Sequence, residues 1–240
     1  MLERVIERRP FLSLVLTSVA VAACGGAGVP AALATASPTP AATASPTPAP
    51  TPTAAPTAAA GSITFTVKDG SKAIVRVTEQ LADRQDLSDA VLTSDKMTGE
   101  FTLQPDGTFA ASSKIVVDLT ALSSDSRQRD NFIKQDTLSV RQFPNATFIP
   151  TRTEGLTLPL PASGDLSFKL TGQMTVHGVT KDVSFDVKAK RTGADLSATA
   201  TVTPAMQFGN FGMTQPRVFS VLSIKDEIRL EVQVVATQKP

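Results

Sequence analysis

The chain lacks most of the residue types from which metal and catalytic centres are usually built. Its 240 residues include one cysteine, one histidine, and neither tryptophan nor tyrosine. A single cysteine cannot form an internal disulfide, and a single histidine excludes a metal site held by several histidines. This histidine, His177, is not accompanied by a Gly-x-Ser-x-Gly nucleophile motif. We therefore expect no metal, no cofactor and no catalytic residues, so the protein is not predicted to be an enzyme.

An excess of charge of one sign is also missing. The formal net charge is +1, with 23 lysines and arginines against 22 acidic residues, and no basic run stands out. Proteins that bind nucleic acid neutralise phosphates with clustered lysine and arginine side chains. The sequence therefore predicts no nucleic-acid partner, and it leaves the oligomeric state open.

The apolar stretch near the N-terminus is too short to cross a bilayer. Residues 11–23 carry no charge and follow a start that contains Arg4, Arg8 and Arg9, whereas a spanning helix needs about 20 residues. A basic start, a short apolar stretch and small residues at its end are typical of a secretory signal peptide. We predict a signal peptide over residues 1–23.

The residues around the sole cysteine resemble the lipobox of bacterial lipoproteins. They read Val21-Ala22-Ala23-Cys24, and the resemblance implies cleavage before Cys24 and its acylation with palmitate or similar chains. Two or more acyl chains hold a protein stably on a membrane. The protein is then expected to be exported and anchored to the outer face of the cell membrane, or to lie in the periplasm or outer membrane of a host with two membranes. The alternative is an ordinary signal peptide with a chance cysteine.

Residues 24–60 consist almost entirely of alanine, proline, threonine, serine and glycine. The sequence TASPTPA occurs at 35–41 and again at 43–49, and no charged residue is present in this segment. Such a segment cannot bury enough apolar surface to offset the entropy of ordering it. We predict a disordered stalk, extended by its prolines, followed by one folded domain over residues 61–240.

Apolar and polar residues alternate with a period of two through most of residues 61–240. The pattern is clearest over 166–176, 183–189, 196–202 and 228–234, where each stretch has one apolar and one polar face. This is typical of antiparallel strands that are buried on one side. About eight such stretches predict an all-β sandwich or barrel, and closure into a barrel would remove exposed strand edges.

One helical stretch interrupts this pattern. Residues 124–134 are predicted to form one short helix, with Asp125 as its N-cap and Phe132 and Ile133 as apolar anchors. Its Arg129-Asp130 pair is open to two interpretations, a catalytic pair or a brace of the helix against the barrel, and we favour the brace.

Between the strands, two further segments are assigned from composition. Leu81 to Thr93 is interpreted as a polar surface loop because it is rich in aspartate. His177-Gly178 is interpreted as the turn of a hairpin, since glycine supplies the backbone conformation that tight turns need.

Two motifs are similar to those of one protein family. The first lies between Ser123 and Phe148 and contains Arg129-Asp130, Phe132-Ile133 and Phe143-Pro144-Asn145-Ala146-Thr147-Phe148. The second is the hairpin sequence Leu170-Thr171-Gly172-Gln173-Met174-Thr175-Val176-His177-Gly178-Val179-Thr180-Lys181. In this order they resemble the YceI-like family over roughly residues 61–237. The segments 63–67 and 207–212 depart from the family's pattern.

The resemblance implies an antiparallel, lipocalin-like β-barrel of about eight strands with an apolar tunnel for a long-chain isoprenoid or another lipid. The residues agree, because several inward positions are small, namely Ala146, Gly172, Ala189, Ala198 and Ala200, and small residues leave room inside a barrel. The candidate ligand-lining residues are Phe65, Val75, Val77, Phe101, Ile115, Val117, Phe148, Phe168, Leu170, Met174, Phe185, Val187, Ala198, Ala200, Leu230 and Val232.

The leading hypothesis is therefore an envelope-anchored protein that sequesters or carries an isoprenoid, quinone or fatty-acyl ligand. The rival is a non-catalytic envelope scaffold or stress-protection protein with a filled barrel core, for which enlarging a lining residue, as in Ala198→Phe, would leave function intact. A third hypothesis, catalysis on a bound lipid, lacks a visible nucleophile–base pair.

Overall fold

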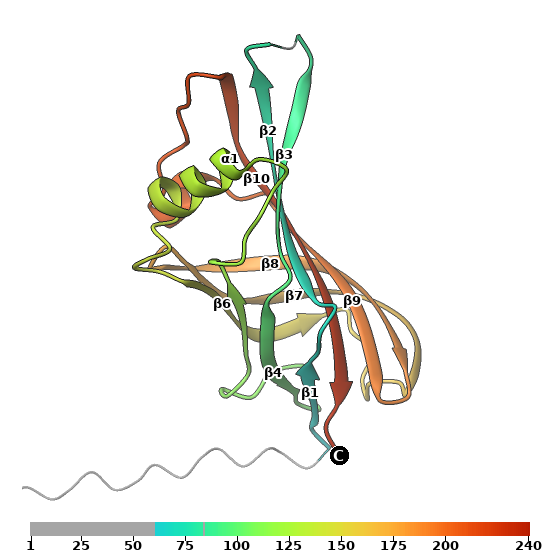
Figure 1. Cartoon of the computed structure of the whole chain (residues 1–240). Coiled ribbons are helices and arrows are strands. Elements are labelled where there is room, and N and C mark those ends of the chain that lie inside the picture. Colours follow the sequence, from blue (N-terminus) through green and yellow to red (C-terminus); the bar gives the residue numbers. More distant parts are fainter. Residues whose placement is uncertain (1–60, 84) are drawn as a thin grey trace, which may run out of the picture. The chain divides into compact units, whose positions relative to one another are not determined.

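Strands dominate the part of the chain that the computed structural model describes, residues 61–83 and 85–240 (Figure 1). The predicted signal peptide, the acylation site Cys24 and the predicted stalk lie outside the described residues. The strands are β1 (Ile63–Val67), β2 (Lys72–Leu81), β3 (Leu87–Ser94), β4 (Met97–Leu103), β5 (Lys114–Asp118), β6 (Asn145–Glu154), β7 (Ser163–Val176), β8 (Val179–Thr192), β9 (Asp195–Val202) and β10 (Val221–Gln238). The helices are α1 (Arg127–Phe132), the π-helix η1 (Ile133–Thr137) and the 3₁₀-helix η2 (Phe208–Phe211).

Eight of these strands close into an antiparallel barrel. The sheet runs β1-β4-β5-β6-β7-β8-β9-β10, and β10 pairs back onto β1 with Phe65 opposite Gln238 and Val67 opposite Ala236. The barrel prediction is confirmed, with its count of about eight strands and its one short helix.

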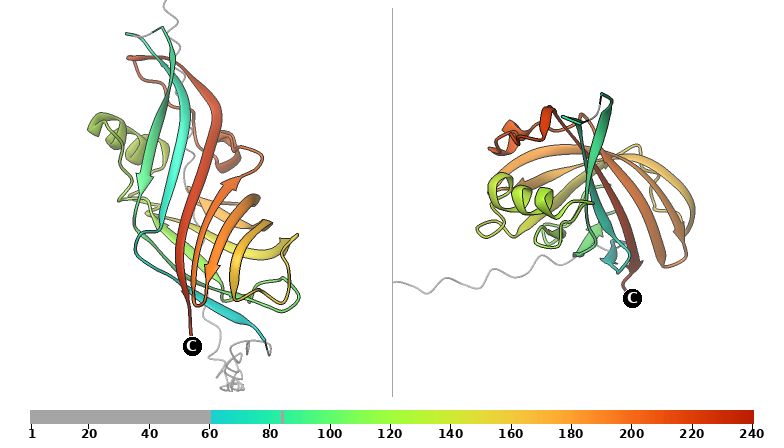
Figure 2. Two further views of the ribbon diagram at one scale, coloured as in Figure 1. Left: turned by 90° about the vertical axis from the view of Figure 1, so that its right-hand side faces the viewer. Right: turned by 45° about the horizontal axis from the view of Figure 1, so that its top comes forward.

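The remaining strands, β2 and β3, extend the wall beyond the closed ring. β10 has 18 residues, and its first part pairs with β2 from Val221 to Gln233 before its end reaches β1. β3 pairs with β2 alone among the named strands. Figures 1 and 2 show the three strands projecting together past one end of the barrel, beside α1.

The interpretation of Leu81 to Thr93 as a surface loop was wrong. Residues Leu87–Ser94 form β3, because Ala90, Leu92 and Ser94 are buried on one face while the residues between them point outward. On β2, Val77 lies opposite Ala90 and Val75 opposite Leu92. The segment was assigned as a loop from its aspartates, whereas a search for residues alternating between a buried and an exposed face would have indicated a strand.

The hairpin between β7 and β8 agrees with the sequence prediction. His177 and Gly178 have φ angles of 51° and 74°, and Val176 pairs with Val179 directly across the turn. Two consecutive residues with positive φ define the type I′ turn that joins twisted antiparallel strands. A side chain at position 178 would also meet the ring of Phe143, because a Cβ there would lie 2.6 Å from Phe143 Cε1.

Ser71 completes the hydrogen bonding between the end of β1 and the start of β2. Four residues, 68–71, separate the two strands along the same edge of β10. The Ser71 hydroxyl oxygen accepts a hydrogen bond from Val235 N–H at 2.9 Å and lies 2.8 Å from the Lys68 carbonyl oxygen. Ser71 is 1% exposed, so water does not reach this position. The Ser71 hydroxyl therefore makes the hydrogen bond to β10 that a neighbouring strand would otherwise make.

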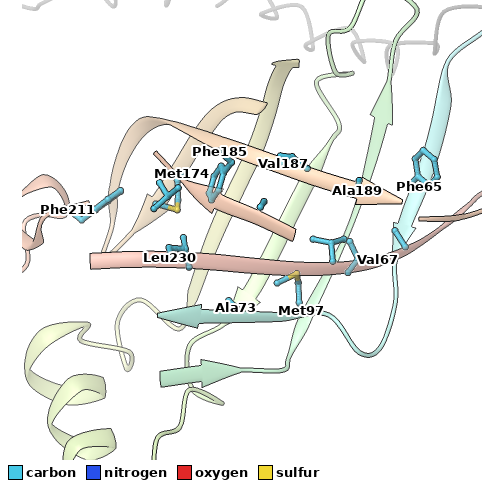
Figure 3. Close-up of a cluster of buried hydrophobic side chains, with 14 residues drawn as sticks. Phe65, Val67, Ala73, Met97, Met174, Phe185, Val187, Ala189, Phe211 and Leu230 are labelled. Atoms are coloured by element: carbon cyan, nitrogen blue, oxygen red, sulfur yellow. The ribbon is translucent and has the colours of Figure 1, made fainter. Parts of the chain in front are cut away.

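One end of the barrel interior is closed by packed side chains. The rings of Phe65 and Phe101 stack with centroids 5.5 Å apart, and the guanidinium of Arg191 lies over Phe65 at 5.6 Å. Figure 3 shows Phe65 and Val67 at this end, and Met174, Phe185 and Leu230 toward the other.

At the closed end, the buried side chain of Arg191 donates hydrogen bonds to uncharged oxygen atoms only. It is 6% exposed, and its guanidinium donates to the carbonyl oxygens of Gly193 and Pro161, both at 3.0 Å, and to Gln238 Oε1 at 2.6 Å. These bonds tie β8 to the loop before β7 and to the end of β10. Buried charge is tolerated where hydrogen bonds satisfy it.

We predict that Ser71→Ala lowers the free energy of unfolding by about 1–3 kcal/mol, because it removes a buried hydroxyl and leaves the Val235 N–H without its partner. Urea unfolding followed by circular dichroism measures the change. Ser167→Ala, on the exposed face of β7, is the matched control and should change stability by less than about 0.5 kcal/mol. Equal stabilities for the two variants would contradict the role of Ser71.

Candidate functional site

An apolar cavity of about 200 Å³ occupies the half of the barrel away from the closed end. Among its lining residues, only Thr137 and Thr147 carry polar side chains. The walls come from β2, β3 and β5 to β10, whereas β1 and β4 contribute no lining residue. The wall residues are Ala73, Val75, Val77, Leu92, Ile115, Val117, Ala146, Thr147, Phe148, Leu170, Met174, Val176, Phe185, Ala200, Ile228, Leu230, Val232 and Val234.

The cavity is covered by residues from the helices and from the segments around them. Ile133, Thr137 and Leu138 reach it from η1 and its end, and Leu138 packs with the buried Leu92 and Leu122. On another side the cover comes from η2 and its surroundings, through Met206, Phe208, Phe211 and Met213. We call these seven residues, Ile133, Thr137, Leu138, Met206, Phe208, Phe211 and Met213, the roof.

The helix beside the roof begins three residues after the predicted start at Ser124, and its N-cap lies one residue later than predicted. Ser126, not Asp125, is the N-cap of α1, and its side chain accepts a hydrogen bond from the backbone N–H of Arg129 at 3.4 Å. Asp125 instead forms an ion pair with the Arg129 side chain. The α-helix ends at Phe132, and the π-helix η1 continues it to Thr137, three residues beyond the predicted end.

Arg129 and Asp130 brace the roof, as favoured from the sequence. Arg129 Nη2 lies 2.7 Å from Glu79 Oε1, and the two side chains are 20% and 7% exposed. Because Glu79 belongs to β2, this pair joins α1 to the barrel wall. Asp130 accepts two hydrogen bonds from Ser124, from its N–H at 2.8 Å and its hydroxyl at 2.6 Å, which fixes the chain entering the helix.

The predicted ligand-lining residues divide into two groups. Eleven of the sixteen border the cavity: Val75, Val77, Ile115, Val117, Phe148, Leu170, Met174, Phe185, Ala200, Leu230 and Val232. The other five do not, namely Phe65, Phe101, Phe168, Val187 and Ala198. Phe65 and Phe101 fill the closed end, and Val187 is 4% exposed in the packed core around them. The part that any of these residues plays in binding stays a prediction.

Gly172 does not widen the cavity, contrary to the expectation from its size. A Cβ at this position would lie 2.5 Å from Phe148 Cζ and 2.5 Å from the Ile149 carbonyl oxygen. The ring of Phe148 thus takes the space that glycine leaves. Among the small inward residues, Ala146 and Ala200 are the ones that border the cavity.

The roof residues of the cavity were missed at the sequence level. Most lie outside strands, so no period-two pattern marks them, and their position depends on how the segments fold back over the barrel. The one available signal was apolar spacing around the predicted helix, where Ile133 and Leu138 are five residues apart. Phe208 and Phe211 lie in the segment noted only for departing from the family pattern.

The charged groups with shifted pKa values lie away from the cavity. Arg229 Nη2 donates to Asp89 at 2.6 Å on the outer wall, and this hydrogen bond lowers the pKa of the Asp89 carboxyl. Hydrogen bonds from neighbouring threonine or lysine side chains lower the pKa of Asp106, Asp118 and Asp186 in the same way. Within residues 61–83 and 85–240, no cluster of three potential metal ligands is present.

In the described part of the chain, no helix combines the length and the hydrophobicity that a membrane-spanning segment requires.

Comparison with known protein families identifies the family of the barrel domain. The model of the YceI-like domain matches residues 57–236, which is most of the chain. The chain belongs to the YceI-like family. Of the two motifs identified in the sequence, the first contains α1, η1 and the start of β6 in this YceI-like domain, and the second forms the β7–β8 hairpin.

Curated relatives are similar over part of their length. A UPF0312 protein of Pseudomonas putida is 33% identical over 111 residues, which cover 43% of this chain and 54% of the relative. A UPF0312 protein of Vibrio vulnificus is 28% identical over 99 residues, covering 41% and 49%. The chain spans about half the length of the curated relatives it matches.

Solved structures share the fold at low sequence identity. A polyisoprenoid binding domain from Saccharophagus degradans, implicated in plant cell wall breakdown, matches with a TM-score of 0.56 at 11% identity, over 73% of this chain and 98% of its own. BcnA of Burkholderia cenocepacia matches with a TM-score of 0.52 at 18% identity, over 71% and 99%. At such identities the likeness shows the fold alone.

We predict that Arg129→Met destabilises the domain by about 2–3 kcal/mol, because it leaves the Glu79 carboxylate buried without its partner. Thermal and urea unfolding measure the loss. Arg152→Met removes an ion pair whose side chains are 62% and 49% exposed, and as the control it should change stability by less than about 1 kcal/mol. A small effect at both positions would mean that the roof is not braced by Arg129.

Proposed function

We propose that this YceI-like protein is an envelope-anchored lipid-binding protein that holds the apolar chain of an isoprenoid, quinone or fatty-acyl compound. The observation that carries the proposal is the cavity, an apolar space inside a barrel whose other end is filled by side chains. Burial of hydrocarbon contributes about 0.8 kcal/mol per CH₂, so such a site binds without charged contacts. The polyisoprenoid binding described for the Saccharophagus degradans relative supports the same ligand class.

The size of the cavity sets how much of a ligand it holds. A dry cavity of about 150 Å³ accommodates benzene, so a cavity of about 200 Å³ has room for about eight carbon atoms. A longer isoprenoid or acyl chain would therefore place one segment in the cavity and the rest outside, unless the roof moves.

The anchoring part of the proposal rests on the sequence around Cys24. Acylation there would keep the barrel close to a bilayer, which is the reservoir of isoprenoid and acyl compounds. The 37 residues from 24 to 60, extended at about 3.1 Å each, would let the barrel move about 100 Å from its anchor.

Binding can be tested with 1-alkanols of increasing chain length and the full chain carrying Cys24→Ser, which removes the predicted acylation site. Affinity, measured by displacement of a fluorescent apolar probe, should rise about fourfold per added carbon and level off near eight carbons. Ala200→Phe should lower the affinity at least tenfold, because its ring would occupy the cavity.

Thr199→Phe is the matched control, since Thr199 neighbours Ala200 on β9 and is exposed, and it should leave binding unchanged. Circular dichroism establishes that both variants are folded. If Ala200→Phe unfolds the barrel, Ala146→Val provides the same test from β6. Alkanols that do not bind the parent chain, or bind the filled variants equally well, would favour the rival scaffold with a filled core. Ala198→Phe does not discriminate, because Ala198 does not border the cavity.

Anchoring has a separate test. In the native host, the unaltered protein should fractionate with membranes and incorporate radiolabelled palmitate, and Cys24→Ser should abolish the label and release the protein from the membrane fraction. Membrane association that survives Cys24→Ser without label would disprove an acyl anchor at this residue.

A further inference from the structure

One hydroxyl beside the cavity has no partner. In the described part of the chain, two buried side-chain oxygens lack a hydrogen bond, those of Ser62 and Thr137, and only Thr137 borders the cavity. Thr137 is 4% exposed. Leaving a buried hydroxyl unpaired destabilises a fold, so an apolar roof would be expected to carry valine at this position unless the hydroxyl serves a ligand.

The unpaired hydroxyl lies at the end of the π-helix. In an α-helix, a threonine hydroxyl commonly bonds the carbonyl oxygen three or four residues earlier. In η1 the carbonyl oxygen four residues earlier, that of Ile133, accepts the backbone N–H of Leu138 at 2.9 Å, and the Thr137 hydroxyl does not bond it. Single π-turns are frequent at functional sites, and this one places Thr137 at the roof of the cavity.

The residues around Thr137 favour an uncharged partner for its hydroxyl over a charged one. All other lining residues except Thr147 are apolar, and none is charged. Lys134 and Asp136 belong to η1, but neither borders the cavity. Arg129 and Glu79, between α1 and β2, already pair with each other. An ionised group placed at Thr137 would therefore be buried without a counter-charge, which is far more unfavourable than burying a neutral one.

We propose that Thr137 is the polar recognition point of the cavity and hydrogen-bonds one uncharged group, a hydroxyl or a carbonyl, on an otherwise hydrocarbon ligand. This inference rests on the proposed function and names the ligand chemistry of the same site. The Thr137 hydroxyl oxygen is buried in this structure, and threonine in helices populates two χ1 rotamers, so a change of rotamer on ligand binding would present Oγ1 to the cavity. The hydrocarbon chain then extends from the roof into the barrel, between the walls that carry Phe185 and Leu230.

Three probes of equal chain length, 1-octanol, octane and octanoate, test the assignment on the full chain carrying Cys24→Ser. In the parent, octanoate at pH 8 should bind at least tenfold more weakly than 1-octanol. Thr137→Val should lower the affinity for 1-octanol about 3- to 10-fold, the range for one net hydrogen bond. The affinity for octane should stay the same or rise, because valine has the same shape without the unpaired hydroxyl.

Thr199→Val is the control, since Thr199 is exposed on β9 and does not border the cavity, and it should change neither affinity. The midpoint of thermal unfolding of Thr137→Val without ligand should equal or exceed that of the parent, which separates the loss of octanol binding from a loss of folding. Equal changes for octane and 1-octanol, or octanoate binding as tight as 1-octanol, would overturn the assignment.

The failure of the inference can be told apart from the failure of the proposed function. If neither octane nor 1-octanol binds the parent chain, the cavity is not a lipid site and both proposals fall. If both bind and Thr137→Val affects them alike, the lipid-binding function stands and the assignment of Thr137 is wrong.

Discussion

The fold depends on the hydrogen bonding of β10 to three neighbours. One edge of this 18-residue strand pairs with β9, and the other pairs first with β2 and then with β1. The contact with β1 closes the ring, which leaves an interior just wide enough for side chains or one small ligand. Whether any part of that interior stays empty is then decided by the size of the inward side chains at each level of the barrel.

Along the barrel axis, the size of the inward side chains divides the interior into a filled part and a cavity. Phe65 and Phe101, with the guanidinium of Arg191 over them, fill the level of β1 and β4. Toward the roof, Ala146 and Ala200 project less far, and the cavity remains between the larger side chains. Arg191 suits the filled end because neutral oxygens satisfy its donors. The same positive charge beside the cavity would face hydrocarbon.

The strands were predictable where one buried face alternates with one exposed face, as in β7 to β10, because the alternation reports burial directly. β3 was missed since Asp83, Asp86 and Asp89 resemble a loop, although Ala90 and Leu92 within it lie on one buried face. The closed end was not predictable, because alternation shows that Phe65 points inward but not whether its ring fills the space or lines it. For the same reason the ring of Phe148 over Gly172 was invisible in the sequence. The roof depends on long-range packing of helical segments, which no local pattern encodes.

The filled level at Phe65 and Arg191 makes the cavity a dead end. A molecule in it cannot pass through the barrel, and must leave by the route along which it arrived, so that the first atoms to enter are the last to depart. If the barrel carries a lipid as proposed, the ligand would enter and leave at the end of the barrel where α1 is paired to β2 by Arg129. The protein would then present the same face to the donor and to the acceptor of the ligand, and the whole barrel would have to reorient between the two.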